Sequence, residues 1–146
     1  MRPVVLTLIM VGLSPHVWGE NPFAGTWKRV SPQRAGSSLT LIYEEVPNGV
    51  KRRSEAVDAQ GRRTGWSYTA YYDEKDYPTN GHPEGDSISL KRIDAHTVLS
   101  TLKKDGRVLY TNRLAISANG RKLTTTITRK NAEGAVTETV SVYEKQ

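Results

Sequence analysis

The chain contains no cysteine and no long hydrophobic run, and each absence excludes a class of protein. Without cysteine there is no disulfide framework, no thiolate metal site and no thiol nucleophile. A membrane-spanning helix needs about 20 apolar residues, whereas the longest uncharged, mostly apolar run covers only residues 4–13. Helical periodicity is also absent after Glu20, so an α-helical domain is not expected.

Motifs for catalysis and metal binding are missing as well. The sequence has no G-x-S-x-G nucleophile elbow, no H-E-x-x-H motif and no paired-histidine metal spacing. After residue 20 the only histidines are His82 and His96, and His96 adjoins a tight Asp94-Ala95 turn, which is typical of an ordinary turn residue. We therefore expect no metal and no cofactor, and the sequence gives no positive sign of an enzyme.

The N-terminus has the layout of a secretory signal peptide. Arg2 precedes the apolar run 4–13, Ser14-Pro15 breaks any helix, and residues 17–19 (VWG) precede a cut before Glu20. A buried N-terminal core segment is the alternative interpretation. No cysteine follows the run, so lipid attachment through cysteine is excluded.

The expected organisation is a signal peptide over residues 1–19 and one domain over residues 20–146, secreted or periplasmic. The 21 basic and 15 acidic residues give a net charge of +6. A content of 36% apolar residues argues against wholesale disorder. Nothing after the signal peptide resembles a membrane span.

Beyond residue 20 the sequence consists of short runs rich in Thr, Val, Ile, Leu and Tyr, separated by turn signals such as Pro47-Asn48-Gly49. Glycine and asparagine accept the positive φ that tight hairpin turns need. Runs at this spacing predict antiparallel strands in a sandwich or barrel. The predicted strands are residues 25–30, 39–46, 50–57, 62–72, 87–93, 96–104, 107–117, 121–130 and 136–145, with a long loop over residues 73–86.

The predicted strands favour a closed sheet. Nine strands in an open sheet would leave exposed edges, which closure removes. Alternation along residues 62–72 places Trp66, Tyr68, Ala70 and Tyr72 on one face, and neither face of such strands is purely charged. The fold prediction is therefore all-β: an antiparallel meander closed into an up-and-down β-barrel of about eight to nine strands.

Motifs at both ends of the domain resemble a known group of barrels. Gly25-Thr26-Trp27 resembles the G-x-W signature of the calycin group, which includes lipocalins, avidins and fatty-acid-binding proteins. Residues 142–146 (VYEKQ) resemble the closing strand of the fatty-acid-binding proteins. The resemblance implies structural roles for Gly25 and Trp27, with Trp27 closing one end of the barrel.

The chain is more closely similar to small secreted bacterial proteins of the lipocalin-like kind. They carry Gly-Thr-Trp-Lys near the mature start, an Asp-Tyr-Pro loop and a similar C-terminal motif. Here these are residues 25–28, 76–78 and 142–146. That group has no assigned activity, so the resemblance implies the fold and export and leaves the chemistry open.

Two departures from the fatty-acid-binding proteins bear on the ligand. Those proteins hold a ligand carboxylate with an Arg two residues before the Tyr of the last strand, and here that position is Ser141. Only Tyr143 carries over as a candidate contact. The two-helix lid is also missing, because only residues 31–38 separate the first predicted strands. Arg113 offers a replacement cation if its side chain points inward, which the alternation does not fix.

The candidate ligand-binding residues are therefore Trp66, Tyr68, Tyr72, Tyr110, Arg113 and Tyr143. Small-molecule pockets are mainly apolar and aromatic with a few polar anchors. The same aromatic residues could instead fill the core. Thr137, Thr139 and Ser141, if they face inward, would make the interior semi-polar.

Two further stretches are unusual. Residues 73–86 hold five carboxylates, but their spacing does not match the helix–loop–helix calcium pattern. A solvated connection over one mouth of the barrel is the favoured interpretation, and a lid over a pocket is another. Basic residues at 51–53 and 62–63 lie on one predicted hairpin and form either an anionic-surface patch or ordinary solvated strand ends.

Together these observations predict an exported monomer that binds a small, partly apolar ligand inside the barrel. One alternative is a barrel enzyme of isomerase or hydrolase type, which needs a cavity group with a perturbed pKa. The other is a filled barrel that acts through its basic surface. Nucleic acid is not an expected partner, because the protein is expected to be exported.

Overall fold

A computed structural model describes residues 21–146, so the predicted signal peptide and the cut before Glu20 lie outside the described residues. Regular structure over residues 21–146 is entirely β-strand, and this part of the chain contains no helix with the length and apolarity needed to cross a membrane. The strands are β1 (Gly25–Ser31), β2 (Ser38–Val46), β3 (Gly49–Val57), β4 (Arg63–Thr64), β5 (Ser67–Tyr71), β6 (Tyr77–Asn80), β7 (Ser87–Asp94), β8 (Thr97–Lys104), β9 (Arg107–Ile116), β10 (Lys122–Lys130) and β11 (Val136–Lys145).

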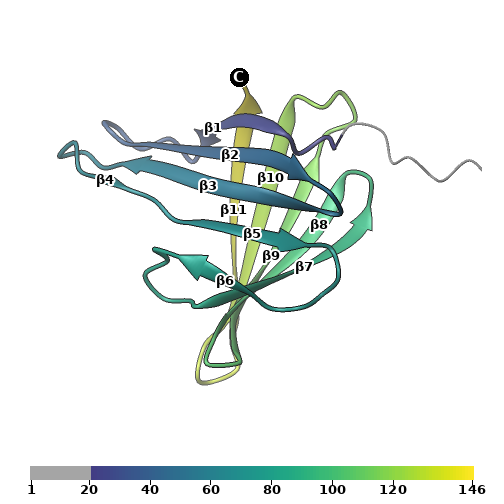
Figure 1. Cartoon of the computed structure of the whole chain (residues 1–146). Helices are drawn as coiled ribbons and strands as arrows, with labels where there is room; N and C mark the ends of the chain where they lie inside the picture. The colour runs from purple at the N-terminus through teal and green to yellow at the C-terminus, as the bar shows by residue number, and fades with distance from the viewer. Residues whose placement is uncertain (1–20) are drawn as a thin grey trace, which may run out of the picture.

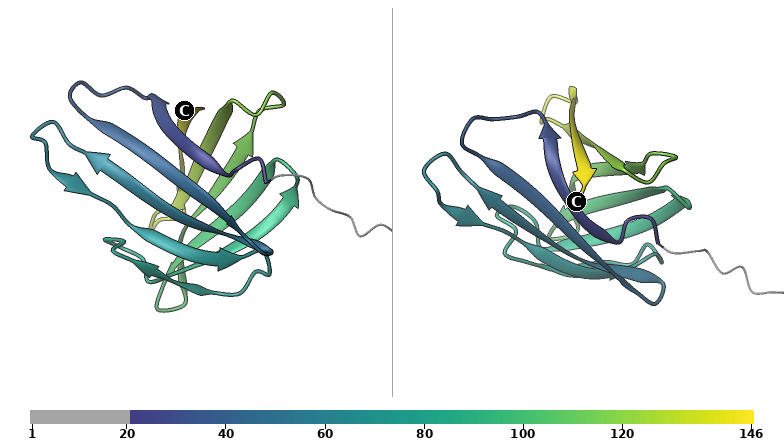
Figure 2. Two further views of the ribbon diagram at one scale, coloured as in Figure 1. Left: turned by 45° about the horizontal axis from the view of Figure 1, so that its top comes forward. Right: turned by 90° about the horizontal axis from the view of Figure 1, so that it is seen from above.

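The strands form one antiparallel sheet that closes on itself (Figure 1). The order around the ring is β2-β1-β11-β10-β9-β8-β7-β6-β5-β3, and a β2–β3 ladder completes it. The short β4 pairs only with β3 and lies outside the ring. Seen from above, β1 to β5 wrap one side of the interior and β7 to β11 the other (Figure 2). The prediction of an all-β closed barrel is confirmed, with ten strands in the ring.

The prediction of a loop over residues 73–86 is wrong at β6, which accounts for the additional strand. β6 joins β5 to β7 through short ladders: Ser67 and Tyr68 face Asn80 and Thr79, and Tyr77 and Pro78 face Ile88 and Ser87. Pro78 has no N–H to donate, and strands seldom contain proline away from an edge. The segment therefore has the composition of a loop although it completes the barrel wall.

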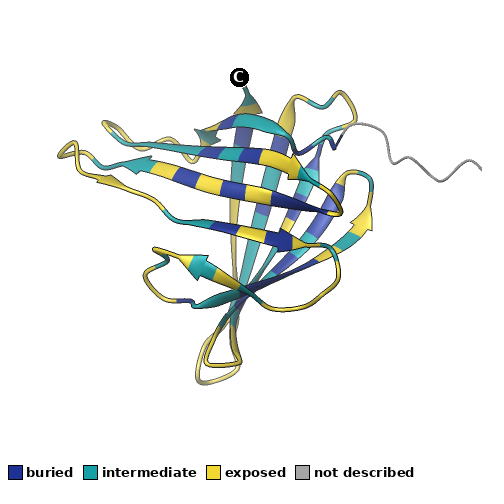
Figure 3. Cartoon of the chain, viewed as in Figure 1, coloured by how far each residue is buried: buried dark blue, intermediate teal, exposed yellow. Residues whose placement is uncertain are grey.

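Buried and exposed residues alternate along strands such as β3 (Figure 3). In β3, Val50, Arg52 and Ser54 are buried, whereas Lys51 and Arg53 are exposed. Successive side chains of a strand point to opposite faces, and in a closed sheet one of those faces is the interior.

One end of the barrel, here called the base, is where the chain enters β1 and where β2 turns into β3. Phe23 fills it, with its ring 6.3 Å from that of Tyr43. Trp27 is fully buried, and its indole N–H donates to the carbonyl of Phe23 at 2.9 Å. Gly25 adopts a φ of 131° beside Lys145, a conformation that favours glycine. Residues 21–27 thus seal the base.

Replacing Trp27 with Ala removes the largest fully buried side chain of the base and its hydrogen bond. We expect the free energy of unfolding to fall by about 3–5 kcal/mol. The matched control is Lys28→Ala, one residue along β1 on the exposed face, with an expected change within about 0.5 kcal/mol. Urea unfolding of both variants measures the difference, and equal losses would contradict the role of Trp27.

Candidate functional site

A cavity of about 290 Å³ lies inside the barrel between the packed base and the opposite end, here called the mouth. The volume corresponds to about ten water molecules at liquid density. Its aromatic wall consists of Tyr43, Trp66, Tyr68, Tyr110 and Tyr143, and its aliphatic wall of Leu39, Leu41, Ile88, Leu114 and Ile127. Its polar lining residues are Arg29, Arg52, Ser54, Ser100, Asn112, Thr125, Thr139 and Ser141. No carboxylate among the described residues lines the cavity.

The structure brings together four of the six predicted ligand-binding residues. Trp66, Tyr68, Tyr110 and Tyr143 come from opposite sides of the barrel and all line the cavity. Tyr72 lies instead toward the base, where its hydroxyl accepts a hydrogen bond of 3.2 Å from the Asn21 side chain. Thr139 and Ser141 also face the cavity, which makes the interior semi-polar as one interpretation of the sequence proposed.

Arg113 is not the cation of this cavity. Its neighbours in β9, Asn112 and Leu114, line the cavity, so the alternation of the strand places Arg113 outside, where it is exposed. Two other arginines line the cavity instead, Arg52 on β3 and Arg29 on β1.

Arg52 is the buried cation that sequence reasoning missed. Only 8% of the residue is exposed, and its guanidinium carbon lies 4.1 Å from the centroid of the Trp66 ring. One of its N–H groups donates to the carbonyl of Trp66 at 3.4 Å, and Arg52 lies opposite Tyr43 in the β2–β3 ladder. The basic triplet at residues 51–53 predicts a surface position for Arg52, and this prediction is wrong. The alternation Val50, Arg52, Ser54 was the available signal for its burial.

Arg29 adds a second positive charge to the wall. It lies opposite Tyr143 in the β1–β11 ladder and lines both this cavity and a second hollow of about 290 Å³ beside residues 32–38. None of the ion pairs among the described residues includes Arg29 or Arg52. The cavity is therefore positive, and no carboxylate of residues 21–146 lines it to balance the charge.

The cavity tyrosines remain hydrogen-bonding phenols at neutral pH. Burial raises the pKa of Tyr43, Tyr68, Tyr110 and Tyr143 above the ordinary value. The positive charge of Arg52 opposes that rise at all four, so its field reaches across the cavity. Among the residues that the structure describes, the Oδ1 atom of Asn112 is a buried acceptor without a hydrogen-bond partner. The wall therefore offers donors on one side and an unsatisfied acceptor on another.

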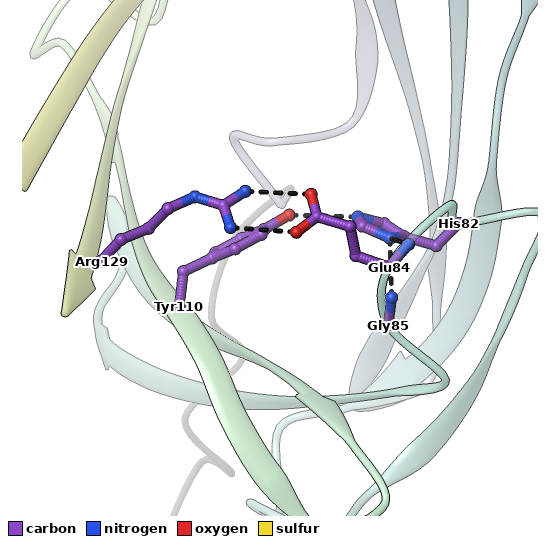
Figure 4. A network of polar contacts seen from close by, with 5 residues as sticks. All are labelled: His82, Glu84, Gly85, Tyr110 and Arg129. Carbon is purple, nitrogen blue, oxygen red and sulfur yellow. Dashed lines mark hydrogen bonds and ion pairs between the residues drawn. The ribbon is translucent and has the colours of Figure 1, made fainter. Parts of the chain in front are cut away.

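A turn at residues 81–86, here called the cover, lies at the mouth, and its side chains reach Tyr110 on β9 and Arg129 on β10 (Figure 4). The Nδ1 atom of His82 accepts the backbone N–H groups of Glu84 and Gly85, both at 3.0 Å. Since Nδ1 accepts, the neutral ring carries its proton on Nε2, which lies 3.3 Å from the Tyr110 hydroxyl. The edge of the His82 ring meets Trp66, with the ring centroids 4.5 Å apart.

An ion pair between Glu84 and Arg129 joins the cover to β10. Two nitrogens of Arg129 in β10 lie 3.2 and 3.3 Å from the two carboxylate oxygens of Glu84. The guanidinium also sits 4.4 Å from the centroid of the Tyr110 ring. Through His82 the turn contacts two cavity-lining aromatics, Trp66 and Tyr110.

Gly85 fixes the turn to the barrel wall. A Cβ at this position would lie 2.5 Å from the Cγ of the fully buried Leu102, so only glycine lets the backbone approach so closely. The Gly85 carbonyl accepts the Thr79 hydroxyl at 2.8 Å, and the next N–H, of Asp86, donates to the Lys103 carbonyl at 2.9 Å. The residues that join β6 to β7 therefore form an ordered cover.

The other candidates have ordinary structural roles. His96 is exposed in a turn, where its N–H donates to the Asp94 carboxylate at 2.9 Å. Of the basic hairpin, Arg53 pairs with Glu55 and Arg62 with Asp58, both exposed. Within residues 21–146, no three His, Asp or Glu side chains group in a way that could hold a metal ion.

Comparisons with known proteins add no relative. Neither a scan against protein-family models nor a search of curated proteins found a match to this chain. The site is therefore interpreted from its own geometry.

The His82 turn predicts a pH dependence of stability. Burial lowers the pKa of His82 below 6.5, and the charges of Arg52 and Arg129 act in the same direction, while Glu84 opposes them. As pH falls, the unfolded chain therefore protonates His82 at a higher pH than the folded chain does. The stability that neutral His82 contributes is complete above pH 6.5 and is lost as pH falls through the lowered pKa.

We expect the wild type to lose more unfolding free energy between pH 7.5 and 5 than His82→Asn, whose amide oxygen accepts the same N–H groups without titrating. The control His96→Asn, at the exposed turn, should lose as much as the wild type. Urea unfolding at each pH measures these differences. If the wild type and His82→Asn respond identically, the neutral His82 is not what holds the turn.

Proposed function

We propose that this protein is an exported, lipocalin-like, monomeric barrel that binds one small, partly apolar molecule in its internal cavity. The observation that carries the proposal is a cavity of about 290 Å³ with an aromatic wall, an aliphatic wall and a few polar side chains. Ligand pockets have this composition, and a volume at the lower end of their range suits a small molecule. The Asp76-Tyr77-Pro78 and G-x-W motifs, together with the closed barrel, support the lipocalin-like assignment.

The cavity favours binding over the two alternatives. A filled barrel acting through its surface would not retain this volume, and the basic hairpin is partly neutralised by Glu55 and Asp58. The perturbed groups of the wall are tyrosines whose raised pKa keeps them protonated, which suits hydrogen bonding to a ligand better than proton abstraction.

Binding is tested with a small uncharged dye that the cavity can hold, 1-aminonaphthalene, added to the protein purified after expression of the full chain in a bacterial host. We expect the dye emission to shift to shorter wavelength and Trp66 emission to be quenched at a stoichiometry of one. Ser141→Phe, which fills the cavity from β11, should weaken binding at least about tenfold, or 1.4 kcal/mol. The control Val140→Phe changes the adjacent exposed residue and should bind as the wild type does.

A native mass spectrum of the same preparation reports the bound state and the oligomeric state together. A monomer carrying an adduct that is lost on denaturation would support the proposal, and the adduct mass would define the ligand. Absence of dye binding by the wild type, or equal binding by Ser141→Phe, would refute it.

Export is tested separately by the processed N-terminus. We expect the periplasmic or secreted product to begin at Glu20, because the apolar run 4–13 directs translocation and is then removed. Leu8→Arg interrupts that run and should leave the unprocessed chain in the cytoplasm, whereas Leu8→Ile should be processed normally. N-terminal sequencing and cell fractionation measure both outcomes. Processing of Leu8→Arg at the wild-type level would contradict the signal peptide.

A further inference from the structure

Arg52, on β3, is a buried arginine without an acidic partner among the described residues. Arg52 is flanked in register by Tyr43 on β2 and Tyr68 on β5, and its guanidinium lies against the Trp66 ring. Its hydrogen bond to the Trp66 carbonyl uses one of the five N–H donors of a guanidinium. The remaining donors lie in a chamber whose wall has no carboxylate among the described residues.

Burial without a counter-charge is costly for a cation. Buried charges in proteins are ordinarily paired, since removing a charge from water is unfavourable without a partner. Cation–π contact with Trp66 and Tyr68, at 4.1 and 5.9 Å, recovers part of that cost but does not neutralise the charge. An anion inside the cavity would complete the pairing.

Three features of the wall fit the anion of a small organic acid better than inorganic phosphate or a neutral molecule. Arg29 places a second positive charge on the same lining. The hydroxyls of Tyr43 and Tyr143 are protonated donors, because burial raises the pKa of each. The aromatic and aliphatic walls then require an apolar body attached to the charged group.

We propose that the cavity selects a compact organic carboxylate, with the carboxylate held by the Arg52 guanidinium and the apolar body packed against Trp66 and the neighbouring tyrosines. This inference rests on the proposed function, since it names the class of molecule that the cavity takes. A guanidinium matches the planar carboxylate with paired N–H donors. The volume limits the ligand to about ten to fifteen non-hydrogen atoms, given that water occupies about 30 Å³ per molecule.

The test compares acids with their isosteric amides, which have nearly the same shape and no charge. The probes are benzoate, 3-phenylpropanoate and 5-phenylpentanoate, each paired with its amide and titrated calorimetrically at pH 7.5. We expect at least one acid to bind the wild type about tenfold or more tighter than its amide, the contribution of a charge-assisted hydrogen bond.

Two variants that differ by one position assign the selectivity. Arg52→Gln should reduce the acid-to-amide ratio to near one while it still binds the uncharged dye. Arg53→Gln removes the same charge from the adjacent exposed residue, which pairs with Glu55, and should keep the wild-type ratio. Arg52→Lys keeps the charge without the planar fork and should show an intermediate ratio. The wild-type ratio itself tests the proposal even if Arg52→Gln does not fold.

The outcomes separate this inference from the proposed function. If the dye binds but no acid is preferred over its amide, the acid selectivity is refuted and the binding barrel stands. If the preference persists in Arg52→Gln, Arg52 does not hold the carboxylate. If neither the dye nor any probe binds, both proposals fail.

Discussion

Closure of a single antiparallel sheet is the constraint on which the rest of this structure depends. A strand that is hydrogen-bonded on both sides cannot turn about its own axis, so its residues alternate strictly between the interior and the outer face. In β3 this alternation buries Val50 and also commits Arg52 to the interior. The guanidinium must then find its partners inside the barrel, because the ladders to β2 and β5 leave it no path to the outside.

The interior is divided along the barrel axis. The base is packed by apolar side chains around Phe23 and Trp27, which bury surface and stabilise the closed sheet. Toward the mouth the same strands contribute Ser54, Asn112 and Thr125, and the packing gives way to a cavity. The packed core and the cavity thus occupy different halves of one barrel, and the same strands run through both.

The sequence was sufficient for the fold because its strongest signals are local. Turn residues such as Asn48-Gly49 predicted the strand ends, and the alternation of Tyr68 and Ala70 with polar neighbours predicted the inner face of β5. β6 was missed because Pro78 and its neighbours have loop composition, and only pairing with β5 and β7 makes the segment a strand.

The cavity was harder to predict than the fold. Four aromatic lining residues were predicted correctly, because small-molecule pockets are mainly aromatic and apolar. They are Trp66, Tyr68, Tyr110 and Tyr143. The burial of Arg52 was missed because its neighbours Lys51 and Arg53 are also basic. Arg113 was a wrong candidate, because the sequence does not show which residues of β9 face inward. The contacts of His82 and Glu84 with Tyr110 and Arg129 join residues that are distant in the sequence, so no local pattern predicts them.

The short ladders of β6 have a consequence for how the wall moves. Each ladder joins only two residue pairs, whereas β10 and β11 are paired along their whole length. The free energy of a local opening grows with the hydrogen bonds and the burial that it disrupts. Within the ring, separating β6 from its neighbours breaks the fewest ladder pairs and should cost the least free energy. The wall of the ring is therefore held least firmly between β5 and β7, because every other ladder of the ring joins at least four residue pairs.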